Sequence, residues 1–129
     1  MEKEVSELFS KLKKLNVKGR IDYDDSNVLW YLSDLVLVRI YPQSAPDEGY
    51  IGVSYVHNGK ELSGTGTHWH PLKEEIWSDI LSLHNGDYVF VAKTSLLSKN
   101  VIMMTTKEFE AKKHKFKNRK YCTYSIIRL

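Results

Sequence analysis

The chain has 129 residues, 42% of them hydrophobic and 27% charged, and a formal net charge of +3 at pH 7. This balance is that of a globular protein, and it excludes intrinsic disorder, collagen and coiled-coil rods. No stretch approaches the ~18 consecutive apolar residues of a membrane helix, so we expect no membrane partner. A chain of this length builds one domain, which we assign to residues 1–129.

The cysteine content and the first residues indicate a compartment. Cys122 is the single cysteine and has no second thiol for an internal disulfide, which fits a reducing environment. Residues 1–7 are too polar and too acidic for a signal peptide. The expected location is therefore the cytoplasm.

Charge is distributed unevenly along the chain. Residues 1–20 carry a net charge of +3, residues 21–87 a net charge of −8 and residues 88–129 a net charge of +8. The densest basic run lies at 107–120, and it is either a solvated surface or a binding segment for phosphate or an acidic partner. Its candidate binding residues are Lys112, Lys113, Lys115, Lys117, Arg119 and Lys120.

The first half of the chain predicts one helix followed by strands. Apolar residues recur at three- and four-residue steps over residues 3–16, as in an amphipathic helix. Residues 43–48 are expected to form a loop, because Pro42, Pro46 and Gly49 interrupt the strand pattern. Asn58-Gly59 predicts a two-residue hairpin turn, because both positions must accept a positive φ. The expected strands are 28–32, 35–41, 50–57 and 60–68.

The second half predicts a helix over residues 71–83, with Pro71 at its first position. A short basic helix is expected over residues 107–115. Further strands are expected at 87–94, 101–106 and 121–129. The fold class is therefore α+β: a single domain with an antiparallel sheet of about six to seven strands and two main helices packed on one face.

The segment at 65–71 has the pattern most suggestive of chemistry. In an extended chain His68 and His70 project from the same side, with Trp69 on the other. Two imidazoles so placed are suited to a divalent metal, which needs a third protein ligand in a catalytic zinc site. The other interpretations are an exposed binding corner formed by these three residues and a purely structural corner.

The hairpin register indicates where a third ligand would come from. If pairing continues unbroken from Asn58-Gly59, His68 lies opposite Gly49 and His70 falls near Asp47. Asp47 and the adjacent Glu48 are therefore the candidate carboxylate ligands or orienting groups.

Aromatic residues are abundant on the expected strands. If one face of the sheet is uncovered, they would line a binding surface. These residues are Trp30, Tyr31, Tyr41, Tyr50 and Tyr55.

One stretch of the chain resembles small bacterial α+β proteins, some of which are similar to the immunity proteins of polymorphic toxin systems. The resemblance covers about residues 66–92. It is carried by His68-Trp69-His70-Pro71, Glu74-Glu75, the helix through Leu83, and Gly86-Asp87 before a strand. It implies a non-enzymatic protein that binds one protein partner.

Three functions are therefore under consideration. The leading hypothesis is a small cytoplasmic protein-interaction protein without a cofactor, because no complete catalytic motif is present. The first alternative is nucleic-acid binding through the 107–120 segment. The second is a metal-binding protein, or a metal-dependent enzyme, at His68 and His70.

Overall fold

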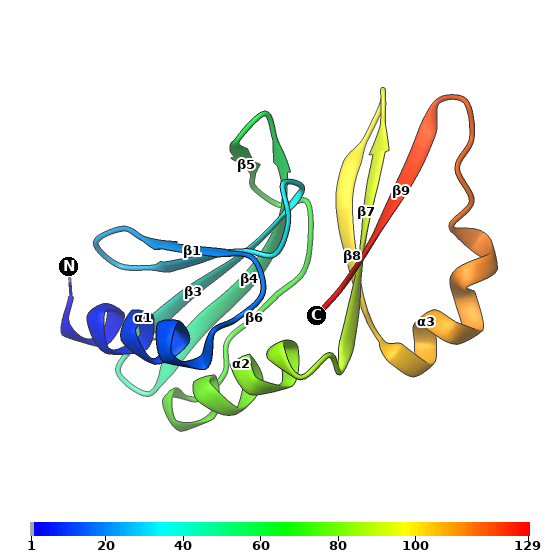
Figure 1. Ribbon diagram of the computed structural model, residues 1–129. Helices are drawn as coiled ribbons and strands as arrows, with labels where there is room; N and C mark the ends of the chain where they lie inside the picture. Colours follow the sequence, from blue (N-terminus) through cyan, green and yellow to red (C-terminus); the bar gives the residue numbers. More distant parts are fainter. Residues whose placement is uncertain (1) are drawn as a thin grey trace.

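The computed structural model describes residues 2–129 as two antiparallel sheets with three α-helices (Figure 1). The predicted α+β class is confirmed, but the strands divide into two sheets. Among the described residues, no helix is both long enough and apolar enough to cross a membrane. In chain order the elements are α1 (Lys3–Leu15), β1 (Arg20–Tyr23), β2 (Val28–Tyr31), β3 (Val36–Ala45), β4 (Glu48–His57), β5 (Lys60–Leu62), β6 (His68–Trp69), α2 (Ile76–His84), β7 (Tyr88–Ser95), β8 (Lys99–Thr105), α3 (Thr106–Lys112) and β9 (Cys122–Arg128).

The first sheet, sheet A, has the order β1-β2-β3-β4-β5, and β6 also pairs with β4. Asn58 and Gly59 have φ values of 51° and 78° at the turn between β4 and β5. His57 pairs with Lys60 across that turn, so the predicted two-residue hairpin is confirmed. The tight turn can form here because asparagine and glycine both tolerate the left-handed backbone conformation.

The second sheet, sheet B, has the order β8-β7-β9. Helix α3 packs on its outer face through Phe109, which lies in a small apolar cluster with Val89, Val91 and Met104. The helix begins at a capping box, in which the Thr105 side chain accepts a hydrogen bond from the backbone N–H of Glu108. Helix α3 therefore stands apart from the other two helices (Figure 1).

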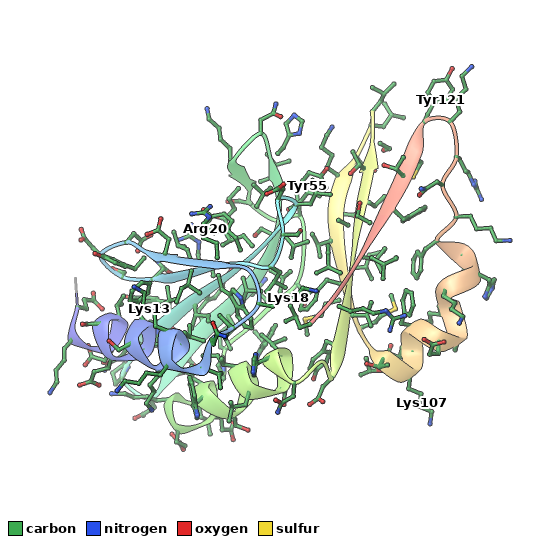
Figure 2. The ribbon with its side chains drawn as sticks, in the orientation of Figure 1. Lys13, Lys18, Arg20, Tyr55, Lys107 and Tyr121 are labelled. Atoms are coloured by element: carbon green, nitrogen blue, oxygen red, sulfur yellow. The ribbon has the colours of Figure 1, made fainter. Side chains whose placement is uncertain are left out.

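The main core lies between the inner faces of the two sheets and helices α1 and α2. Trp30 is fully buried in it, and Tyr55 is 1% exposed. The Tyr55 hydroxyl lies 2.6 Å from the Thr94 hydroxyl of sheet B, and Tyr55 is labelled in Figure 2. Because both sheets bury the apolar side chains of their inner faces in this one core, the structure is a single domain. Helices α1 and α2 lie on one face of sheet A, as predicted.

Some element boundaries differ from the predicted ones. The predicted loop at 43–48 is wrong, because β3 continues to Ala45 and β4 begins at Glu48. Pro42 lies within β3 at an irregular stretch of the pairing between Tyr41 and Ala45, where a missing N–H is tolerated. The predicted helix over 71–83 begins later, with a 3-10 turn at Lys73–Glu75 followed by α2.

Candidate binding surfaces

The outer face of sheet A points away from the core. Strand residues alternate between the two faces, so Trp30 and Tyr55 lie inside, whereas Tyr31, Tyr41 and Tyr50 lie half-buried on the outer face. Helices α1 and α2 pack against the inner face and α3 packs on sheet B (Figure 1). No helix within the described residues therefore covers the outer face.

One end of the outer face holds a group of ring side chains that we call the aromatic corner: Tyr41, Tyr50, His68 and His70. The Tyr50 ring stacks on His68 with 5.8 Å between ring centroids and meets His70 edge-on at 5.5 Å. Tyr41 pairs with Tyr50 across β3 and β4. A Cβ on Gly52 would come within 2.4 Å of the Tyr50 hydroxyl, so the absence of a side chain at Gly52 lets Tyr50 lie across β4.

The two histidines share one side of the chain, as predicted. Their ring centroids are 5.9 Å apart, and both side chains are exposed. Trp69 points the other way, packs against the core and donates a hydrogen bond from Nε1 to the Asp79 carboxylate of α2 at 2.8 Å. Of the three residues predicted to form a binding corner, His68 and His70 are accessible and Trp69 acts as an anchor.

The predicted register beyond the hairpin is wrong. His68 lies opposite Gly52, not Gly49. Asp47 instead lies beside Lys73, whose backbone N–H donates to the Asp47 carbonyl at 3.0 Å. Asp47 is thus separated from His70 along the strand, and within residues 2–129 no three His, Cys, Asp or Glu side chains are grouped to hold a metal ion. A metal site at His68 and His70 stays a prediction without its third ligand.

The cause of the register change is an insertion between β5 and β6. The chain leaves the ladder after Leu62 and returns at His68. The Thr65 hydroxyl fills the gap: it accepts a hydrogen bond from the Tyr55 backbone N–H at 2.8 Å and donates one to the Leu62 carbonyl. At Gly66, a Cβ would lie 2.1 Å from the Val53 carbonyl oxygen. This insertion sets the position of the aromatic corner.

An ion-pair network crosses the middle of the outer face. Arg39 contacts the Glu61 carboxylate at 2.9 Å and the Asp24 carboxylate at 3.2 Å. Burial alone would lower the pKa of Arg39, but the hydrogen bond and charge of Glu61, reinforced by Asp24, raise it. The guanidinium is therefore held charged and in a fixed position between two strands and the β1–β2 turn.

A cleft of about 600 Å³ lies at the opposite end of sheet A from the β3–β4 turn. It is lined by residues of the β2–β3 and β4–β5 turns, including Asp34 and His57. The Arg20 guanidinium stacks over the Tyr31 ring at 4.1 Å on its wall. The cleft and the aromatic corner thus give the outer face two contoured regions rather than a flat surface.

The basic 107–120 segment does not form a compact cluster. It follows the outer side of sheet B from Lys107 at one end to the neighbourhood of Tyr121 at the other (Figure 2). Phe109 and Phe116 stack on each other, with 6.1 Å between centroids, and face the sheet. The candidate cations Lys112, Lys113, Lys115, Lys117, Arg119 and Lys120 are exposed.

Comparisons with protein-family models, with curated proteins and with solved structures gave no match. The resemblance to immunity proteins therefore stays a prediction. The function of this chain has to be argued from its own surfaces.

We expect Thr65→Val to destabilise the fold by about 1–3 kcal/mol, because it leaves the Tyr55 N–H without its acceptor. Thr65→Ser keeps the hydroxyl and should cost much less. Urea unfolding of both variants measures the difference. Equal losses for valine and serine would show that the hydroxyl does not hold the insertion.

Asp24 makes stability depend on pH. Burial raises its pKa, but hydrogen bonds from Asn27 and Ser26, with a further one from Arg39, outweigh burial and hold the pKa below the ordinary value of 3.8. A lowered pKa stabilises the fold above pH 3.8, and this contribution is lost as the pH falls through the folded-state pKa.

We therefore expect Asp24→Asn to lower the free energy of unfolding at pH 7 by less than about 1 kcal/mol, because Asp24 is a largely exposed partner. The difference between the variant and the natural chain should shrink as the pH falls below 3.8. Unfolding curves at pH 7 and pH 3 check this, and a difference that grows in acid would contradict the assignment.

Proposed function

We propose that this chain is a protein-binding protein, of the kind that immunity proteins represent, and that its partner docks on the outer face of sheet A. The observation that supports this most directly is the aromatic corner, whose histidines are exposed and whose tyrosines are half-buried on a face that no helix of residues 2–129 covers. Tyrosine and arginine are enriched where proteins bind each other, because they combine a large apolar area with a polar tip.

The geometry of the corner favours a protein partner over a metal. Tyr50 contacts both histidine rings, and no carboxylate completes a ligand set within the described residues. The rings are also held in place before binding, since Tyr50 rests across Gly52. Pre-ordered side chains lose little conformational entropy on association.

The charges around sheet A indicate which charge the surface of the partner should carry. The charges within its strands cancel, and the net charge of −8 over residues 21–87 comes mainly from the turns of the sheet (Asp24, Asp25, Asp34 and Asp47) and from the region of α2. On the outer face, Arg39 is already neutralised by Asp24 and Glu61. We therefore expect a protein partner with basic groups that face the rim of the sheet, because complementary charge steers association and disfavours acidic competitors.

Replacing two rings of the aromatic corner, in Tyr41→Ala/Tyr50→Ala, should abolish stoichiometric co-purification of the partner from the native organism. Each truncated central tyrosine is expected to weaken binding by about 2 kcal/mol or more if it is a hot spot. The measurement is affinity capture with quantification of the captured protein.

The matched control is Tyr121→Ala, which removes a 65% exposed tyrosine from the turn before β9. It should leave capture unchanged. Loss of capture in this control, or full retention in the double variant, would place the binding surface elsewhere. Circular dichroism of both variants verifies that the sheets are intact.

Nucleic-acid binding remains the second candidate because residues 111–129 contain no acidic side chain. Against it, Phe109 and Phe116 are turned inward and leave few rings for base stacking. If the segment binds nucleic acid, Lys115→Ser/Lys117→Ser should reduce affinity for a single-stranded oligonucleotide and flatten its salt dependence by about 1.4, at ~0.7 per charge. Fluorescence anisotropy at several salt concentrations decides this, and the absence of binding at low salt would reject it.

A further inference from the structure

The tip of the β7–β8 hairpin exposes two consecutive leucines. Leu96 is 82% exposed and Leu97 is 98% exposed, whereas the leucines of the core are nearly inaccessible. The two occupy the centre of the Ser95–Ser98 turn. Such positions ordinarily hold glycine, asparagine, aspartate, proline or serine. Leucine here serves neither the turn nor the core, which points to a role outside the folded chain.

The turn that carries these leucines is closely hydrogen-bonded. The Ser95 backbone N–H donates to the Ser98 carbonyl at 2.9 Å, and the Ser98 N–H donates to the Ser95 hydroxyl at 3.0 Å. The Lys99 ammonium also donates to the Ser95 carbonyl at 3.2 Å. The backbone of the tip is therefore ordered, and it holds both leucine side chains away from the protein.

The turn before β9 lies beside this tip. Ser95 pairs with Cys122, which in turn forms a bridge with Arg119. Tyr121, 65% exposed, lies at the same end of the molecule as the hairpin tip (Figure 2). The Lys120 ammonium lies 5.3 Å from the centre of the Tyr121 ring. An exposed apolar tip is thus flanked by a tyrosine and by cations.

No acidic side chain opposes these cations on the surrounding strands. Residues 88–107 and 111–129 contain neither Asp nor Glu. Where carboxylates do occur, in α3, Glu110 is paired with Lys113 and Arg128. The tip therefore presents its leucines within a positively charged surface.

We propose that this end of sheet B docks on an anionic lipid surface. Leu96 and Leu97 enter the boundary between headgroups and acyl chains. Tyr121 lies at the headgroup level, where its ring and hydroxyl match both environments. Arg119 and Lys120 contact the anionic headgroups. One small apolar insertion needs such cations for useful affinity, because a short apolar group alone binds membranes only marginally.

Lipid fits this surface better than the other anionic partners. The tip is a projecting hairpin, which a fluid bilayer accommodates without a preformed pocket. Nucleic acid would use the cations and leave both leucines in water. The proposal departs from the expectation of no membrane partner, which rested on the absence of a long apolar segment; interfacial docking needs none. It also concerns a different surface from the protein-binding face of sheet A.

Co-sedimentation of the full chain with vesicles tests this. We expect binding to vesicles of phosphatidylcholine with 30% phosphatidylserine, weak binding to pure phosphatidylcholine, and release at high salt. Leu96→Ser/Leu97→Ser should lose at least about tenfold in affinity, since it removes both apolar groups. Lys120→Ser should lose about fivefold. In Leu97→Trp, tryptophan emission should shift to shorter wavelength when the anionic vesicles are added.

The matched control is Leu72→Ser, which removes a leucine that is 46% exposed on the sheet A side of the molecule. It should bind vesicles like the natural chain. Soluble glycerophosphoserine should not displace the protein, because it offers the headgroup without a surface. The proposal is overturned if the double serine variant binds like the natural chain, if glycerophosphoserine releases the protein, or if an oligonucleotide binds and the anionic vesicles do not. None of these results bears on capture of a protein partner by the aromatic corner.

Discussion

Both sheets depend on burial of their inner faces in one shared core. The alternation of β3 and β4 sends Val38 and Val53 into this core and leaves Arg39 and Gly52 on the opposite face. That division keeps the side chains of the outer face free of packing against α1 and α2. The same rule applies to sheet B, whose outer face is closed by α3. Of the two outer faces, that of sheet B is thus covered by a helix, and that of sheet A is left open by residues 2–129.

Much of the fold could be predicted because the signals are local. Asn58-Gly59 identifies its own turn, and the apolar stripe of α1 identifies its buried face. The division of the strands into two sheets has no such local signal, because pairing between distant strands depends on the whole core. The continuation of β3 past Pro42 was also missed, since a proline argues against a strand unless an irregular pairing accommodates it.

The candidate sites were predicted less completely. The shared orientation of His68 and His70 follows from strand geometry alone and was found. The prediction for Asp47 was wrong because no pattern in the sequence indicates that the pairing is interrupted after β5. There the Thr65 hydroxyl, and not a backbone carbonyl, accepts the hydrogen bond from the Tyr55 N–H. The contact of Tyr50 with both histidine rings could not be found without the true register. Leu96 and Leu97 did carry a signal in the sequence, because they are two large apolar residues between the expected strands 87–94 and 101–106. Hydrophobic periodicity identifies strands and helices but not an exposed turn.

The order of the strands along the chain has a consequence for synthesis. Sheet A is complete at Trp69, whereas the three strands of sheet B lie between Tyr88 and Arg128. A nascent chain that has reached residue 70 therefore has every strand of sheet A, but lacks α2 and the residues of β7 and β8 that close the core beside it. At this stage Tyr55 also lacks Thr94, its partner across the sheets. The last third of the chain thus covers a core that the first half has begun to form. A chain interrupted before that point would expose apolar surface of the kind that chaperones recognise.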